Sequence, residues 1–158
     1  MEVFIDNRSG VELPLDRIKE LALYVLGAEA LPEATELSVS FVGIDEITEL
    51  NAVYRNKPEP TDILSFELDD PWEEYPCKEN ADKETQQLLL GDIVINPDMA
   101  NKHARLEEVS LEEELWILVI HGILHLVGFD HENAEDAKAM EEKEDDYFYQ
   151  WELMLGDL

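Results

Sequence analysis

The alternation of apolar and polar residues divides the chain into short strands separated by helices. Strands are predicted at residues 2–6, which read EVFID, and at 37–43, where apolar and polar residues alternate in LSVSFVG. Two further strands are predicted at 62–69 and 88–96, in DILSFELD and LLLGDIVIN. These segments predict one small sheet of about four strands.

Between the strands, apolar residues recur three and four positions apart, which is the spacing of one helix face. A first helix is predicted to begin at Pro14 and to end at Gly27. Asp45 is predicted to cap a second helix. Asn96 and Pro97 supply a cap and a first-turn proline for a third helix.

The fourth predicted helix is the most apolar part of the chain. Ser110 and the glutamate three residues later form a capping box at its start, and Gly128 can end it in a left-handed turn. From residue 115 onward it is apolar on all sides, which predicts a position at the centre of the fold. Asn133 is predicted to cap a last helix, whose outer face is a solvated run of Glu and Asp.

The order of these elements predicts a single α+β domain over residues 1–158. In it, about five helices pack on the small four-stranded sheet around one buried helix. Residues 69–88 combine acids and two prolines without clean periodicity, and are predicted to be a loop insertion. A loop of this length in a small domain is often functional or mobile, and a variable solvated loop is the plainer interpretation.

Composition narrows the classes of function. The 158 residues are 45% apolar, enough to bury a core, and the net charge of -28 excludes a protein that binds polyanions over its whole surface. The single cysteine, Cys77, fits a reducing, cytoplasmic compartment. No secretory signal is expected, because the start, MEVFIDNRSG, has no basic region followed by an apolar run. No membrane partner is expected, because the longest apolar stretch (115–129) is shorter than the about 20 residues that span a bilayer.

Three of the four histidines stand in the segment HGILHLVGFDH, residues 121–131. His121 and His125 are four residues apart and therefore project from one face of a helix. Gly128 breaks that helix, so His131 can turn back to meet them. Three neutral imidazoles leave one tetrahedral position open, which is the layout of a catalytic zinc site. An ion held in this way can lower the pKa of a bound water to about 7 and act as a Lewis acid.

Several alternatives bear on this metal site. His103 lacks the spacing of the other histidines and is predicted to be a surface residue rather than a fourth ligand. Three imidazoles also accept nickel, cobalt or copper. The spacing is that of the metalloprotease signature H-E-x-x-H-x-x-G-x-x-H, but Gly122 stands where those enzymes have their glutamate base. A metallopeptidase is therefore disfavoured.

Together with two further segments, HGILHLVGFDH resembles the signature of the YbeY-type endoribonucleases, which are single-domain bacterial metalloproteins. YRNKPEPTDILSF (54–66) is similar to the arginine-containing segment of that family. LLGDIVI (89–95) is similar to its glycine-aspartate strand. The histidine motif is the most specific of the three, and the matched segments run from residue 54 to 131.

The resemblance implies a zinc-dependent, single-strand-specific endoribonuclease. It implies a role in ribosomal RNA processing, notably at the 3′ end of the small-subunit (16S) RNA, and in ribosome quality control. It also implies a sheet of three parallel strands and one antiparallel strand. The zinc ligands of the family fall on His121, His125 and His131, and its functional arginine falls on Arg55.

Arg55 has the chemistry that this role needs, because a guanidinium can hold a phosphate through two hydrogen bonds and stabilise developing charge. A structural ion pair with one of the many acids is the alternative for Arg55, and Lys57 is a weaker phosphate candidate. Asp130 beside a ligand could orient an imidazole or simply make the turn.

The strong negative charge predicts weak binding to free RNA, with affinity coming from the ribosome or a ribosomal protein. Two rival functions stay open from the sequence alone. One is a non-catalytic ribosome assembly factor whose metal holds the fold. The other, less favoured, is the metallopeptidase.

Overall fold

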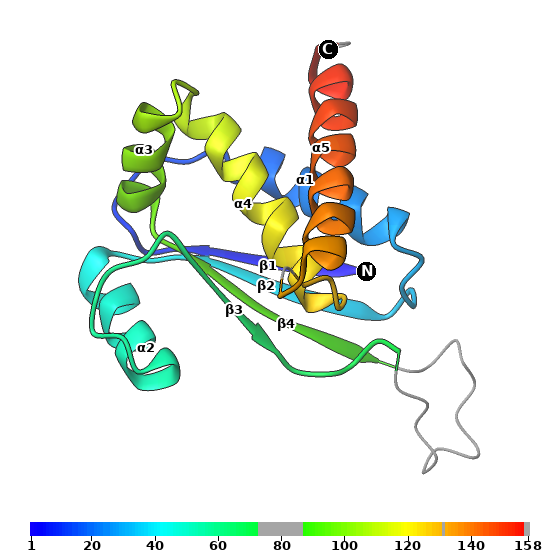
Figure 1. Ribbon diagram of the computed structural model, residues 1–158, viewed down its shortest axis with the longest axis horizontal. Coiled ribbons are helices and arrows are strands. Elements are labelled where there is room, and N and C mark those ends of the chain that lie inside the picture. The colour runs from blue at the N-terminus through cyan, green and yellow to red at the C-terminus, as the bar shows by residue number, and fades with distance from the viewer. Residues whose placement is uncertain (73–86, 131, 157–158) are drawn as a thin grey trace.

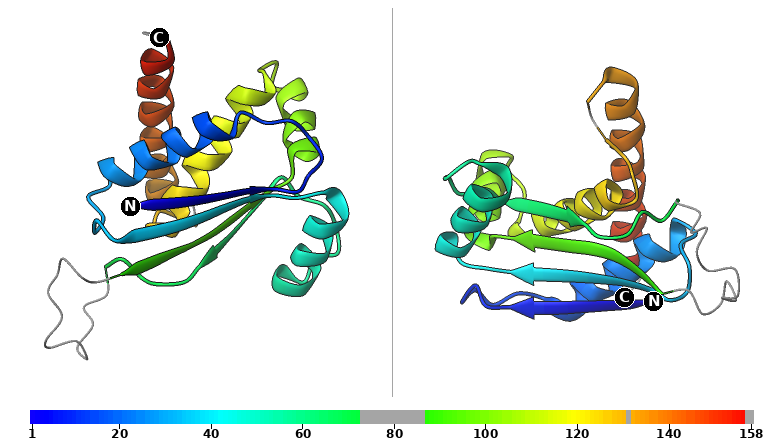
Figure 2. Two further views of the ribbon diagram at one scale, coloured as in Figure 1. Left: turned by 180° about the vertical axis from the view of Figure 1, so that it is seen from behind. Right: turned by 90° about the horizontal axis from the view of Figure 1, so that it is seen from below.

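The strands of the computed structural model form one mixed sheet. The structure describes residues 1–72, 87–130 and 132–156. The four strands are β1 (Glu2–Asn7), β2 (Thr35–Phe41), β3 (Ile63–Glu67) and β4 (Leu88–Ile95). Their order is β1-β2-β4-β3, in which β1, β2 and β4 are parallel and β3 runs antiparallel to β4 (Figure 2). The expected sheet of three parallel strands and one antiparallel strand is confirmed.

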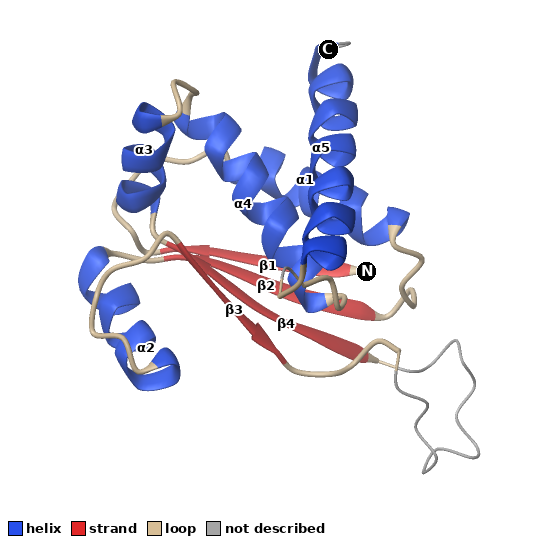
Figure 3. Ribbon diagram, in the orientation of Figure 1, coloured by secondary structure: helices blue, strands red, loops and turns tan. Residues whose placement is uncertain are grey.

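Five helices are present in the described part of the chain. They are α1 (Leu15–Ala28), α2 (Ile44–Arg55), α3 (Pro97–Leu106), α4 (Leu111–Leu126) and α5 (Ala134–Gly156). Four of them lie on one face of the sheet and α2 lies on the other, as Figures 1 and 3 show. The long helix α5 rises away from the sheet toward the C-terminus (Figure 1). The expected α+β fold with about five helices is therefore confirmed.

The core lies between the sheet and α1, α4 and α5. Along β2, side chains alternate between buried and half-buried, as expected for a strand with one face on the core. Helix α4 is buried along most of its length, which confirms its predicted place at the centre. A smaller apolar cluster of Val42, Ile47, Leu64 and Val94 joins α2 to the opposite face. None of the described helices is long and apolar enough to span a membrane.

Most of the predicted helix ends are confirmed by hydrogen bonds. The Asn96 side chain accepts from the backbone N–H of Met99 at 2.8 Å, and the Ser110 hydroxyl accepts from that of Glu113 at 3.1 Å. Gly128 takes the left-handed conformation, with φ of 107°, just after α4. The two side-chain hydrogen bonds satisfy backbone N–H groups that the start of a helix leaves unpaired.

Two predicted helix ends are wrong. Helix α2 begins after Gly43, whose backbone is extended, so Asp45 falls inside the first turn. There its negative charge still favours the helix N-terminus without capping it. Helix α1 runs one residue past Gly27, and the left-handed residue that follows its end is Ala30, with φ of 57°.

Two predictions about chain organisation stay predictions. The loop insertion expected at 69–88 lies mostly outside the described residues, because residues 73–86 are not among them. The extent of the domain, expected as 1–158, depends on the same segment. The described residues on either side of it are Trp72 and Gln87.

At Gly91, strand β4 closely approaches both β3 and α4. A Cβ atom built on Gly91 would lie against the backbone carbonyl oxygen of Phe66 in β3 and 2.9 Å from Cδ2 of Leu126 in α4. Only a residue without a side chain fits between a neighbouring strand and the end of the central helix at this distance. Gly91 therefore lets β3, β4 and α4 meet.

We expect Gly91→Ala to lower the free energy of unfolding by about 1–3 kcal/mol, because the added methyl group would clash with the backbone of the neighbouring strand. Gly27→Ala is the matched control, since its Cβ would meet no atom within 4 Å and alanine favours the helix. Urea unfolding of both variants measures the difference. Equal stabilities for the two variants would contradict this account of Gly91.

Candidate functional site

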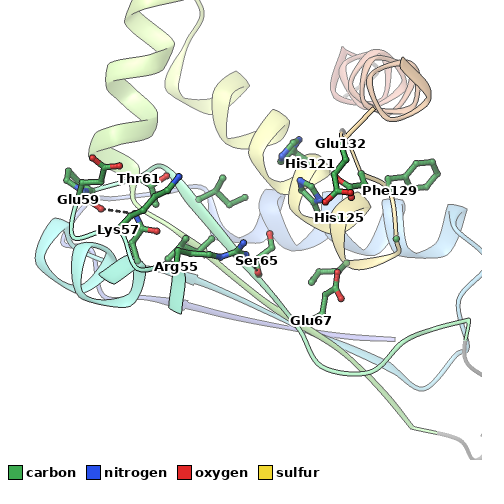
Figure 4. A pocket seen from close by; sticks show the side chains of 17 residues that line it. Arg55, Lys57, Glu59, Thr61, Ser65, Glu67, His121, His125, Phe129 and Glu132 are labelled. Carbon is green, nitrogen blue, oxygen red and sulfur yellow. Dashed lines mark hydrogen bonds between the residues drawn. The ribbon is translucent and has the colours of Figure 1, made fainter. Parts of the chain in front are cut away.

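A pocket of about 810 Å³ opens between the C-terminal half of α4, strand β3 and the loop that follows α2. Its volume is that of a small-molecule site. Figure 4 shows Arg55 reaching toward Ser65 of β3, while two histidines enter from α4. Polar residues that line it include Arg55, Lys57, Ser65, Glu67, His121 and His125.

Two of the three histidines predicted as metal ligands lie side by side in this pocket. The rings of His121 and His125 have centroids 4.6 Å apart and are nearly perpendicular, at 86°. Both belong to α4 and lie one helical turn apart, as their spacing predicts. His131 lies outside the described residues. The structure therefore brings two of the predicted ligands to one cavity. The third, His131, stays a prediction from the sequence pattern.

The adjacent Gly122 fixes which face of α4 carries these histidines. A Cβ atom on Gly122 would lie 2.8 Å from Cδ1 of Ile93 in β4 and 3.2 Å from Cδ1 of Ile63 in β3. The helix is therefore pressed onto the sheet at this residue. A glutamate here, as in the metalloprotease signature, would drive a charged side chain into the buried contact.

A hydrogen bond from α5 holds the first histidine. Nδ1 of His121 lies 2.6 Å from Oε1 of Glu144, and both side chains are partly buried. A carboxylate on one ring nitrogen fixes the tautomer and orientation of an imidazole and raises the basicity of the other nitrogen. Sequence reasoning missed Glu144, because it stands in an acidic run read as solvated surface and 23 residues from its partner.

The turn after α4 is anchored from both sides. Nε1 of Trp72 donates to the backbone oxygen of Val127 at 2.6 Å. On the other side, Nζ of Lys143 lies 4.9 Å from the centre of the Phe129 ring, a cation–π contact. The same ammonium group is 2.7 Å from a carboxylate oxygen of Glu29. These contacts position the segment that leads from His125 toward residue 131.

Arg55 stands at the end of α2 and lines the pocket. One Nη2–H group donates to the backbone oxygen of Ser65 at 2.9 Å. Within the described part of the chain it forms no ion pair, so the structural ion pair considered as an alternative is not seen there. The following loop is fixed by the side chain of Asn51, which donates to the backbone oxygen of Glu59 at 2.9 Å. Lys57 also lines the pocket.

Carboxylates outnumber permanent cations in the described lining of the pocket. The cations are Arg55 and Lys57, and the carboxylates are Glu59, Glu67, Asp130 and Glu132. A phosphate therefore meets a net negative surface unless a further positive charge is present. Asp130 does line the pocket, and its two predicted roles stay predictions.

Three other potential ligands gather near the N-terminal end of α4. Ligand atoms of Asp62, His103 and Glu114 all lie within 4.8 Å of one another, so this group could bind a metal ion. His103 does not line the pocket of His121 and His125, and its side chain is 42% exposed. The His103 ring is paired with Asp62, a contact between residues far apart in the sequence that no sequence pattern predicts.

Comparison with known proteins agrees with the sequence motifs. A relative from Parafrankia sp., named Endoribonuclease YbeY, is 36% identical over 157 residues, which is 99% of this chain and 98% of the relative. Another of the same name, from Salinispora tropica, is 36% identical over 140 residues, which is 89% of each chain.

The fold comparison points the same way. The solution structure of TM1509 from Thermotoga maritima matches with a TM-score of 0.65 and 31% identity, covering 94% of this chain and 88% of that one. The family model described as Endoribonuclease YbeY matches residues 4–152. With its mixed sheet, its histidine-bearing central helix and these matches, the chain belongs to the endoribonuclease YbeY family.

Proposed function

We propose that this protein is a zinc-dependent, single-strand-specific endoribonuclease. Its proposed role is in ribosomal RNA processing, at the 3′ end of the 16S RNA, and in ribosome quality control. The observation that carries the proposal is one pocket lined by His121, His125 and Arg55, in a chain of the endoribonuclease YbeY family. A cytoplasmic location is part of the proposal, because ribosomes and their RNA are there.

The residues proposed to hold the zinc are His121, His125 and His131. The donor set fits, because two neighbouring imidazoles line one cavity and Nδ1 of His121 is bonded to Glu144, so Nε2 is the nitrogen proposed to hold the ion. When bound, zinc supplies a Lewis acid and activates water for hydrolysis. Glu144 acts as a positioning residue, since it keeps the His121 ring in one orientation.

Arg55 is proposed to bind the scissile phosphate. The hydrogen bond to Ser65 uses one of five guanidinium N–H donors and holds the side chain at the pocket. The remaining donors can bind two phosphate oxygens and stabilise the negative charge that grows on them during cleavage. Because Arg55 has no carboxylate partner among the described residues, its charge is not already neutralised by one.

The size and charge of the pocket support the proposed substrate and partner. A cavity of about 810 Å³ suits a nucleotide from a single strand better than a base-paired duplex. With a net charge of -28, the protein has few cations for binding RNA phosphates along a long track. Affinity is therefore proposed to come from the ribosome or a ribosomal protein.

His125→Ala is expected to abolish cleavage of a labelled single-stranded RNA by the purified protein, because one of three proposed ligands is lost. A chelator should stop the parent protein in the same way, and added zinc should restore it. Both proteins are purified identically, because contaminating ribonucleases would cut in either preparation.

Cleavage by both proteins alike would identify a contaminant and count against the proposal. If the parent holds one equivalent of zinc and neither protein cuts either free RNA or ribosome-bound RNA, the assembly factor with a structural metal becomes the better account. Circular dichroism of His125→Ala separates loss of activity from loss of fold.

For Arg55→Ala we expect a loss of about 100-fold in the cleavage rate, with zinc content unchanged. Arg55→Lys should recover only part of the rate, since an ammonium group cannot bind two phosphate oxygens in one plane. Arg17→Ala removes the same charge from a half-exposed site on α1, outside the pocket, and serves as the control. Loss of activity to the same degree in the control would show that only net charge matters.

Glu144→Gln is expected to weaken zinc binding by about 10- to 100-fold, because an amide holds the His121 ring less firmly than a carboxylate. Competition with a chelator of known affinity measures this without reference to activity. Asp145→Asn makes the same change of charge at an exposed neighbouring position. Unchanged affinity in Glu144→Gln would remove Glu144 from the site.

A further inference from the structure

A second group of ligand atoms gathers where three elements meet, apart from the histidine pocket. Asp62 directly precedes β3, His103 lies in α3 and Glu114 lies in the first turn of α4. One ligand atom from each lies within 4.8 Å of the other two. The backbone oxygen of Asp62 also accepts from Asn96 N–H at 2.9 Å, so this position is tied to the start of α3.

Glu114 is the most buried member of this group. Only 8% of the residue is exposed, whereas Asp62 and His103 are half-buried, and the ligand atoms of both lie within 4.8 Å of a Glu114 carboxylate oxygen. Burial, followed by the negative charges of Asp62 and Glu107, raises the pKa of this carboxyl group. A buried carboxylate is unfavourable unless it is hydrogen-bonded, paired or coordinates a metal.

The distances within the group suit a divalent ion. Nδ1 of His103 lies 3.0 Å from Oδ2 of Asp62. Two neighbouring ligands of an octahedral ion, each about 2.1 Å from it, are also about 3 Å apart. Carboxylates suit manganese and magnesium while imidazole suits zinc, iron and other transition metals, so the mixed set favours a divalent transition ion.

We propose that Asp62, His103 and Glu114 form a second divalent-cation site, which takes an ion of the Mn²⁺ class. It is a separate site from the histidine pocket, since Glu114 precedes His121 by seven residues, about 10 Å along the axis of α4. Asp62 stands between Thr61 and Ile63, which both line the pocket. An ion at this site therefore fixes one wall of the pocket to α3 and α4.

The test is a titration of the zinc-loaded protein with Mn²⁺, in which electron paramagnetic resonance measures the free ion. The parent is expected to bind one Mn²⁺ saturably. Glu114→Gln is expected to lose at least tenfold in affinity while its zinc content stays the same. Glu112→Gln removes the same charge from an exposed position on the same helical turn and is expected to bind as the parent does.

Equal Mn²⁺ binding by the parent and Glu114→Gln would overturn the proposal, because the ion would then be held by the acidic surface in general. No saturable binding by the parent would overturn it as well. Thermal unfolding gives a second readout, in which Mn²⁺ should raise the melting temperature of the parent and leave that of Glu114→Gln unchanged. Neither readout depends on RNA cleavage, so failure here is distinguishable from failure of the proposed function.

Discussion

The contact between the central helix and the sheet is the constraint on which the rest of the structure depends. At Gly122 the helix α4 approaches β3 and β4 so closely that a Cβ atom would lie 2.8 Å from Ile93. The approach fixes the rotation of α4 about its axis. The neighbouring His121 and the next turn's His125 are thereby turned toward the pocket, although almost every other residue around them is apolar and buried. The face of α4 that carries Gly122 packs on the sheet, and the neighbouring face carries the two histidines. The hydrophobic pattern of the helix, which is apolar on all sides, does not indicate which face is which.

Charge sets a second condition on the same site. The described pocket lining has more carboxylates than permanent cations, and the whole chain carries a net charge of -28. At physiological salt, charges farther than about 8 Å from a phosphate are largely screened, so the few groups inside the pocket decide whether a phosphate enters. Arg55 and the ion proposed for the histidines are the groups that can make the local charge positive. An acidic protein of this kind would select its substrate through one local spot rather than through a broad basic surface.

The sequence predicted the elements that depend on local chemistry and missed those that depend on distant pairs. Alternation of apolar residues located the strands, and the caps at Asn96 and Ser110 followed from hydrogen bonds within one turn. The histidine spacing located two residues of the pocket for the same reason. The pairing of His121 with Glu144, and of His103 with Asp62, joins residues 23 and 41 positions apart, and no periodicity encodes such contacts. The predicted cap at Asp45 failed because an extended Gly43 could take that place.

Two consecutive residues of α5 connect the end of α1 to the histidine pocket. Lys143 is paired with Glu29, and Glu144 is bonded to His121, so docking of the C-terminal helix and orientation of the ring depend on one another. Any ion that His121 holds is then bound more tightly when α5 is docked than when it is detached. Thermodynamic linkage is reciprocal, so the ion shifts the docking equilibrium of α5 by the same factor. Docking of the C-terminal helix and binding of the ion would therefore each favour the other through His121.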